Sequence, residues 1–266
     1  MNILRSCRIL ALWCGVLSFS TLIEGGASPA QAATTTCSYN FTVRSTHSFL
    51  RYCVTENGNI QAIETPAGHR HLGQSGEGYG VCQESPAIEY HDYATEDSGN
   101  WNPAVMVSHT SSSVKIARTT SDGHWTLTQT ISKSSGPPSI KVVMALKNNR
   151  DVAATAYLVR YADVAPDGIV VSHMGATANM AFGFYHDPDD PPPRYGLLLE
   201  NAGKQTFGYW QSLYQDGGVG PNPCAWAFRG RQGFGEYVIF GGLIMAYAGP
   251  VPALGTKTAT MIYRGM

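Results

Sequence analysis

The chain has 266 residues, of which 14% are charged and 43% are hydrophobic, and its formal net charge is −1 at pH 7. This balance, with no run of basic residues, excludes a basic surface that would bind nucleic acid or an anionic membrane. Few charges together with 29 glycines are typical of an extracellular β protein rather than of a cytosolic helical one.

The N-terminus has the features of a secretory signal peptide. Arg5 and Arg8 precede an apolar run from Ile9 to Ile23, and the small-residue pattern Ala30-Gln31-Ala32 follows. The run holds about 15 residues, fewer than the roughly 20 needed to span a bilayer, so no membrane anchor is expected. We predict that residues 1–32 are removed and that the mature protein is secreted, either outside the cell or into a periplasm.

The remaining residues, 33–266, are expected to form a single β-sandwich domain, because no Pro/Gly/Ser linker divides them. Alternating side chains predict strands over Cys37–Arg44 and Phe49–Val54, and Asn57-Gly58 supplies a tight turn into the next strand. The stretch Thr65–Ser98 is rich in glycine, histidine and tyrosine, so we predict that it is formed largely of loops.

The clearest fold signal lies in Val114–Val171, which predicts five consecutive strands of an antiparallel meander. Asp122-Gly123 suits a tight hairpin, and in Trp125–Ile131 apolar residues alternate with threonines, as in a strand with one buried face. Ile140–Leu146 alternates in the same way, and Pro166-Asp167-Gly168 supplies a turn before the last strand. The predicted fold class is therefore an all-β antiparallel sandwich, or a supersandwich, with little helix.

The C-terminal third has a less regular pattern. His173–Pro223 mixes short segments, of which Phe182–Tyr185 is predicted to be extended, with a proline-rich loop at Pro188–Pro193, which suits an exposed connection better than a central strand. Ala259–Tyr263 is predicted to be the closing strand. No stretch shows the apolar spacing and caps of a helix.

Four cysteines remain after the signal peptide: Cys37, Cys53, Cys82 and Cys224. An even number in an oxidising compartment predicts two disulfides, although four cysteines allow three connectivities. A turn at Ser45-Thr46-His47 would bring Cys37 back to Cys53, which favours that pair and leaves Cys82 with Cys224. A zinc site is the alternative, but the spacing contains no C-x₂₋₄-C pair.

Three internal stretches resemble the central strands of galactose-mutarotase-like β-supersandwich domains: residues 122–127, 142–149 and 157–161. Residues 252–260 are similar to the final turn and strand of many bacterial sandwich domains. The resemblance implies the fold. Epimerases of that family carry an Asn-Gly-His stretch and a pair of histidines around the sugar ring, and the Asn-Gly-His stretch does not occur in this sequence, so the resemblance does not extend to their active site.

His69 and His71 are two residues apart, so on an extended segment both rings would project from one face, as metal ligands can. His91, Glu77 or Glu84 would have to supply a third ligand. Two solvated loop histidines are the alternative interpretation.

Asp187, Asp189 and Asp190 offer oxygen ligands for calcium, with a proline-stiffened solvated turn as the alternative. A carboxylate pair could also hydrolyse glycosides, although the sequence fixes no separation between the candidates. These candidates are Glu77, Glu84, Glu200 and Glu236. No nucleophile elbow is present, and no cofactor is expected.

Aromatic residues beside polar ones are the strongest functional indication, because flat amphipathic rings stack on sugar faces while their neighbours bond the hydroxyls. Core packing is the alternative for each of them. The predicted binding residues are Tyr79, His91, Tyr93, Tyr185, His186 and Trp210. The favoured function is a carbohydrate-binding module for a glycan or polysaccharide. A mutarotase-like or other carbohydrate-active enzyme and a structural or adhesion protein of the cell envelope remain open, as does the oligomeric state.

Overall fold

The computed structural model describes residues 36–46, 48–84, 87–93, 96–134, 137–169, 173–185, 195–203, 205–216, 224, 227, 232–236 and 241–266. The predicted signal peptide lies outside these ranges. Within them the regular structure is almost entirely antiparallel β-strand, which confirms the predicted fold class. None of the described helical segments is long and apolar enough to cross a membrane.

The strands form three sheets. The large sheet has the order β16 (Gly233–Glu236), β12 (His173–Ala176), β13 (Met180–Phe184), β14 (Gly196–Asn201), β18 (Thr256–Gly265), β10 (Ser139–Asn148), β9 (Trp125–Lys133), β8 (Ser113–Thr119), β7 (Val105–His109). The medium sheet has the order β15 (Tyr209–Asp216), β17 (Gly241–Val251), β11 (Ala154–Val164), β4 (Leu72–Glu84), β5 (Ala87–Tyr93), β6 (Glu96–Asp97). The small sheet contains β1 (Tyr39–Arg44), β2 (Phe49–Val54) and β3 (Ile60–Glu64), and one 3₁₀ turn, η1, spans Pro166–Gly168.

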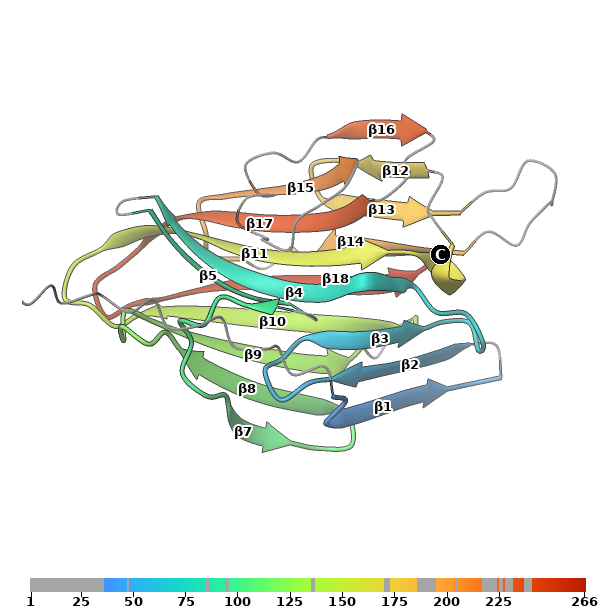
Figure 1. Ribbon diagram of the computed structural model, residues 1–266, viewed down its shortest axis with the longest axis horizontal. Helices are drawn as coiled ribbons and strands as arrows, with labels where there is room; N and C mark the ends of the chain where they lie inside the picture. The colour runs from blue at the N-terminus through green and yellow to red at the C-terminus, as the bar shows by residue number, and fades with distance from the viewer. Residues whose placement is uncertain are drawn as a thin grey trace, which may run out of the picture.

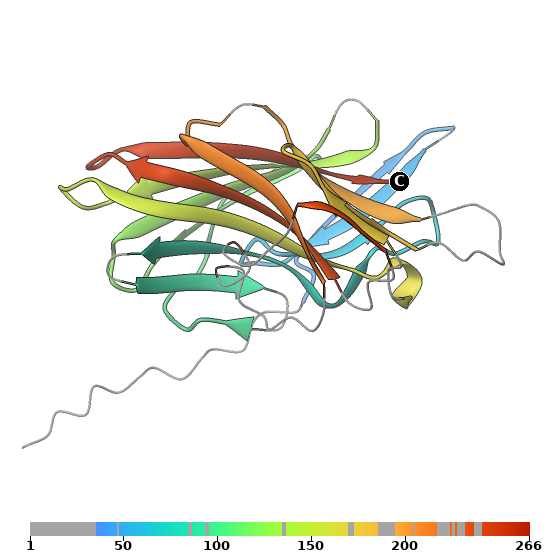
Figure 2. The same ribbon diagram turned by 90° about the horizontal axis from the view of Figure 1, so that it is seen from above.

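The strands run roughly parallel to the long axis of the molecule, and the large sheet can be followed from β16 at the top of Figure 1 to β7 at the bottom. Figure 2 shows the same strands from above, turned by 90°. One hydrophobic core contains side chains of all three sheets, including Tyr52, Trp125 and Leu158. This core leaves one outer face on each of the larger sheets.

The predicted alternation is confirmed on two central strands. On β9, Trp125, Leu127 and Ile131 are buried, and on β10 the buried residues alternate with exposed Lys141 and Lys147. Both strands have one face on the core, so a period of two fixes which side chains are buried.

The meander prediction is right for three strands and wrong for the rest. β8, β9 and β10 are antiparallel neighbours, but β18 occupies the other side of β10, and β11 crosses to the medium sheet between β4 and β17. Alternation reports a buried face and does not report which sheet the strand joins. After η1, Ile169 is not in a strand, and Val170 and Val171 lie outside the described residues.

The prediction of loops over Thr65–Ser98 is also wrong, because most of this stretch forms β4 and β5. Glycine is depleted in strands, so its density here indicated loops. On β4, however, Gly78 lies directly against Tyr93 and Asp92 of β5, where a Cβ would overlap both residues. The glycine therefore permits close strand approach rather than a turn.

Both predicted cysteine pairs are at disulfide distance. Cys37 and Cys53 join β2 to the segment before β1, and Cys82 of β4 joins Cys224, with 5.6 Å between the Cα atoms of each pair. Such bonds are typical of proteins that fold in an oxidising compartment.

A fully buried ion pair connects the sheets. Arg160 of β11 contacts Glu77 of β4 through two nitrogens, one of them 2.8 Å from Oε2, and Tyr263 of β18 donates to Glu77 Oε1 at 2.8 Å. The backbone N–H of Ile60, at the start of β3, donates to Glu77 Oε2 at 2.7 Å, and Arg160 also donates to Gln129 of β9. Glu77 is therefore bonded from all three sheets.

A second buried group lies beside the first. Arg118 of β8 forms ion pairs with Asp92 of β5 and with Asp97 of β6, the latter at 2.9 Å. The Asn59 amide donates to the backbone oxygens of Glu77, at 3.3 Å, and of Asp92, at 3.0 Å. The two ion-pair groups therefore act as one polar layer inside the sandwich.

Replacing Glu77 by Gln should strongly destabilise the fold, because it leaves the Arg160 guanidinium uncompensated in the interior. We expect the free energy of unfolding to fall by about 3–5 kcal/mol. Glu200→Gln is the matched control, since it breaks an exposed pair with Arg264 and should cost at most about 1 kcal/mol. Urea denaturation measures both variants, and equal losses would contradict the role given to Glu77.

Asp92 should make the stability of the protein dependent on pH. Burial raises the pKa of Asp92 to about 7, although Arg118 opposes the increase and the carboxylate of Asp97 adds to it. An unfolded chain releases this proton near pH 4, whereas the folded protein holds it until about pH 7. The folded state thus binds the extra proton, and the free energy of unfolding should fall as pH rises through this window.

Asp92→Asn keeps the shape of the protonated side chain and removes its titration. Denaturation at several pH values between 5 and 8 should therefore give a flatter profile for this variant than for the natural protein. Asp151→Asn, at an exposed position, is the control and should keep the natural profile. An unchanged slope in Asp92→Asn would show that another group causes the dependence.

Candidate functional site

The predicted binding residue Tyr79 is part of the core. Its side chain is fully buried on β4, its hydroxyl donates to the backbone oxygen of Asn57 at 2.8 Å, and its ring packs at 5.8 Å from that of Trp101. A residue enclosed between the sheets cannot stack on a ligand, so this assignment is corrected. For Tyr79 the alternative interpretation from the sequence, core packing, is the correct one.

His91 and Tyr93 lie together on β5, on the outer face of the medium sheet. Their ring centroids are 6.3 Å apart, and the Tyr93 hydroxyl donates to Glu96 at 3.2 Å. Burial lowers the pKa of His91, although Glu96 and Glu89 oppose the shift. Neither ring nitrogen of His91 has a hydrogen-bond partner among the described residues.

Part of this outer face of the medium sheet is covered. Cys224 and Ala227 pack on it and form a small second core with Val159, Leu213 and Ile244. The disulfide joins Cys224 to Cys82 near the end of β4. Tyr93 is 2% exposed and His91 9%, too little for either ring to offer a flat surface to a ligand.

The other predicted binding residues lie elsewhere. Tyr185 follows β13 and donates its N–H to Tyr195 at 3.2 Å, and Trp210 lies on the edge strand β15, where its indole donates to Asn179 at 3.1 Å. His186 lies outside the described residues. Of the five predicted residues that the structure describes, it brings His91 and Tyr93 together and leaves Tyr79, Tyr185 and Trp210 apart from them.

The histidine pair does not form a metal site in the structure. His69 Nδ1 pairs with Asp167 Oδ2 at 2.7 Å and its ring stacks on Tyr195, whereas His71 is buried and its Nε2 bonds Thr65 O. The described residues contain no cluster of three metal-ligating side chains. The candidate calcium ligands Asp187, Asp189 and Asp190 lie outside the described residues.

The carboxylates proposed for glycoside chemistry are dispersed. Glu77 is in the interior with Arg160, and Glu200 pairs with Arg264 at 3.2 Å on the outer face of the large sheet. Glu236 is on β16 opposite His173, and Glu84 ends β4. None of these strands places its glutamate across from His91.

A partly exposed aromatic surface lies instead on the outer face of the large sheet, over β12, β13 and β16, which are at the top of Figure 1. We call it the aromatic face, and its members are His173, Phe182, Phe184 and Phe234. The pairing register puts them on one side: His173 is opposite Phe184, and Gly175 is opposite both Phe182 and Phe234. Alternate residues of β13, Ala181 and Gly183, face the core.

Three rings of the aromatic face are nearly parallel and stacked, and Phe234 is tilted by 37° against His173 and by 38° against Phe182. His173 and Phe184 are inclined by 3° with centroids 5.0 Å apart, and Phe182 and Phe184 by 17° at 6.3 Å. A Cβ at Gly175 would lie 2.5 Å from Cζ of Phe182, so that ring lies flat across the glycine. Phe234 is 55% exposed at the edge of the sheet, far more than a core phenylalanine.

Polar groups border these rings. On β14, Leu198 lies opposite Phe182, and Glu200 lies opposite Met180, which is 38% exposed. The Glu200–Arg264 ion pair is about as exposed as Met180. The border therefore offers hydrogen-bond donors and acceptors with no net charge, beside a flat apolar surface.

Sequence reasoning missed the aromatic face as a site. Phe182-Gly183-Phe184 was expected to be extended, and a strand would place both phenylalanines on one side. This alternation of Phe182 and Phe184 was the sequence signal that could have indicated the aromatic face. The contribution of Phe234 depends on β16 pairing with β12, which no local pattern predicts.

No family model matches the sequence, and no curated protein matches it. A bacterial glucoamylase in complex with acarbose superposes with a TM-score of 0.54 over 89% of this chain at 10% identity, and this chain spans 33% of the glucoamylase chain. A galactose mutarotase-like protein from Lactobacillus casei superposes with a TM-score of 0.51 over 86% of this chain and 100% of its own at 8% identity. The fold is thus that of galactose mutarotase-like proteins, which confirms the resemblance, and identities this low show the fold alone.

Proposed function

We propose that the protein is a secreted, non-catalytic carbohydrate-binding module that stacks the aromatic face on the rings of a glycan or polysaccharide. The partly exposed cluster of aromatic rings carries this proposal, because the apolar face of a sugar ring packs on an aromatic surface and leaves its hydroxyls at the edge. Phe234, which is 55% exposed, is the ring most open to a ligand.

The border of the aromatic face supports the same ligand. Sugar hydroxyls both donate and accept, and the Glu200–Arg264 pair beside the rings offers a carboxylate and a guanidinium. The fold shared with a glucoamylase and with a galactose mutarotase-like protein supports a saccharide by analogy only.

Binding is favoured over catalysis because an acid–base mechanism needs two groups that face each other in an accessible site. His91 is covered, Glu77 lies in the interior, and Glu200 lies on the outer face of the large sheet. The two disulfides, together with the predicted signal peptide, support secretion.

A glycan array of the mature protein tests the proposal, followed by calorimetry with the best ligand. Phe184→Ala combined with Phe234→Ala should weaken binding by about tenfold or more, because each lost stacking contact is worth on the order of 1 kcal/mol. Tyr209→Ala is the matched control, an aromatic residue 54% exposed on the medium sheet, and should bind as the natural protein does.

Mutarotation and glycoside hydrolysis assays run on the same sample. Turnover of a sugar would favour the enzyme alternative and contradict a non-catalytic module. A protein that circular dichroism shows to be folded, yet that binds nothing on the array, would favour a structural or adhesion role and remove the proposal.

A further inference from the structure

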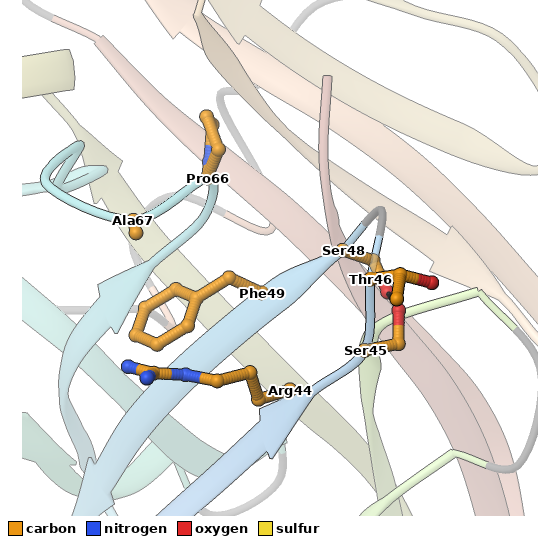
Figure 3. A pocket seen from close by; sticks show the side chains of 7 residues that line it. All are labelled: Arg44, Ser45, Thr46, Ser48, Phe49, Pro66 and Ala67. Atoms are coloured by element: carbon orange, nitrogen blue, oxygen red, sulfur yellow. Dashed lines mark hydrogen bonds between the residues drawn. The ribbon is translucent and has the colours of Figure 1, made fainter.

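A pocket lies beside the small sheet, which does not contribute to the aromatic face. It has a volume of about 330 Å³ and opens between the turn joining β1 to β2 and the segment that follows β3 (Figure 3). We call it the hairpin pocket, and its lining residues are Arg44, Ser45, Thr46, Ser48, Phe49, Pro66 and Ala67. This volume is at the lower end of the roughly 300–1,000 Å³ of small-molecule sites.

One side of the hairpin pocket carries a positioned cation. Arg44 ends β1 opposite Phe49 in the pairing register, and its guanidinium carbon lies 5.3 Å from the centroid of the Phe49 ring. Figure 3 shows the guanidinium alongside that ring. Stacking on an aromatic face holds the guanidinium plane in place while its N–H groups stay available at the edge.

No carboxylate among the described residues neutralises Arg44. The described ion pairs of this region join Arg51 to Glu64 and His69 to Asp167. Glu64, the last residue of β3, also accepts from Gly68 N–H at 2.8 Å, so its charge is already engaged by its own neighbours. Arg44 is therefore the charged residue of the pocket lining.

Hydroxyl groups and an apolar wall complete the hairpin pocket. Ser45, Thr46 and Ser48 gather at the turn, where the oxygens of Ser45 and Ser48 are 2.5 Å apart, while Phe49 and Pro66 form the wall (Figure 3). A ligand that matches this lining has an oxyanion that pairs with the Arg44 guanidinium and hydroxyl groups that hydrogen-bond the turn. It also has a ring whose apolar face packs on Phe49 and Pro66.

We propose that the hairpin pocket binds the carboxylate or sulfate group of an acidic saccharide, with Arg44 as the oxyanion-binding residue. Both groups present two oxygens in a plane, which a guanidinium bonds in bidentate fashion. The saccharide part of this statement rests on the proposed function, whereas the oxyanion part rests on the pocket alone.

Titration of the mature protein with sodium glucuronate, glucose 6-sulfate, neutral glucose and inorganic sulfate, followed by NMR, tests the proposal. Glucuronate or glucose 6-sulfate should bind saturably and more weakly as salt increases, with shifts in the signals of residues 44–49, and glucose should leave those signals unchanged. The stronger of the two acidic sugars identifies the group that the pocket prefers.

Arg44→Gln should weaken that binding at least about tenfold, and Arg44→Lys should give an intermediate loss because the charge stays and the bidentate geometry goes. Lys141→Gln, at an exposed position on the outer face of the large sheet, is the control and should bind normally. Full binding by Arg44→Gln would overturn the assignment.

Two further outcomes would overturn the proposal. If inorganic sulfate binds as tightly as the acidic sugars, the pocket takes an adventitious ion only. If a folded protein binds none of the four compounds, the pocket takes no oxyanion.

The proposals for the aromatic face and for the hairpin pocket can be contradicted independently of each other. The Phe184→Ala, Phe234→Ala protein should still bind glucuronate or glucose 6-sulfate at the hairpin pocket, and Arg44→Gln should still bind neutral glycans at the aromatic face. Loss of both activities in either variant would contradict two independent sites.

Discussion

The buried pair of Arg160 and Glu77 is the interaction on which the architecture depends. Two charges inside an apolar core are tolerated only when hydrogen bonds satisfy them, and here those bonds come from every sheet. A shift of one sheet against another by a single residue would break several of them at once. The polar layer therefore fixes the relative placement of the sheets, a task that apolar packing performs with less directional specificity.

With the sheets fixed from within, the outer faces of the two larger sheets differ. On the medium sheet Cys224 and Ala227 pack against the strands, and His91 and Tyr93 are buried. On the large sheet the aromatic face is partly exposed, on neighbouring strands whose inner faces are anchored in the core. Rings held in this way are pre-organised, so a ligand need not immobilise them on binding. The hairpin pocket has the same character, since strand register and a ring hold Arg44.

Local sequence pattern predicted what depends on local alternation: the faces of β9 and β10, the extended Phe182-Gly183-Phe184 and the hairpin that brings Cys37 to Cys53. It failed where a distant strand decides. The glycines of β4 indicated a loop because the sequence does not show that β5 lies against Gly78. Tyr79 is buried, but nothing in the sequence around it distinguishes it from a surface tyrosine. The aromatic face needs Phe234 from a strand that pairs across a long interval of sequence, and no pattern within either segment contains that information.

The covalent link between Cys82 and Cys224 spans a sequence separation of 142 residues, so more than half of the chain lies within one closed loop. A protease that cuts once at any exposed turn inside this loop leaves two fragments that stay joined. The cover over the medium sheet then remains attached to β4 at its original position. If the protein is secreted, as the sequence predicts, extracellular proteases can reach it. Because of this disulfide, a single cleavage inside the loop then releases no fragment of the chain.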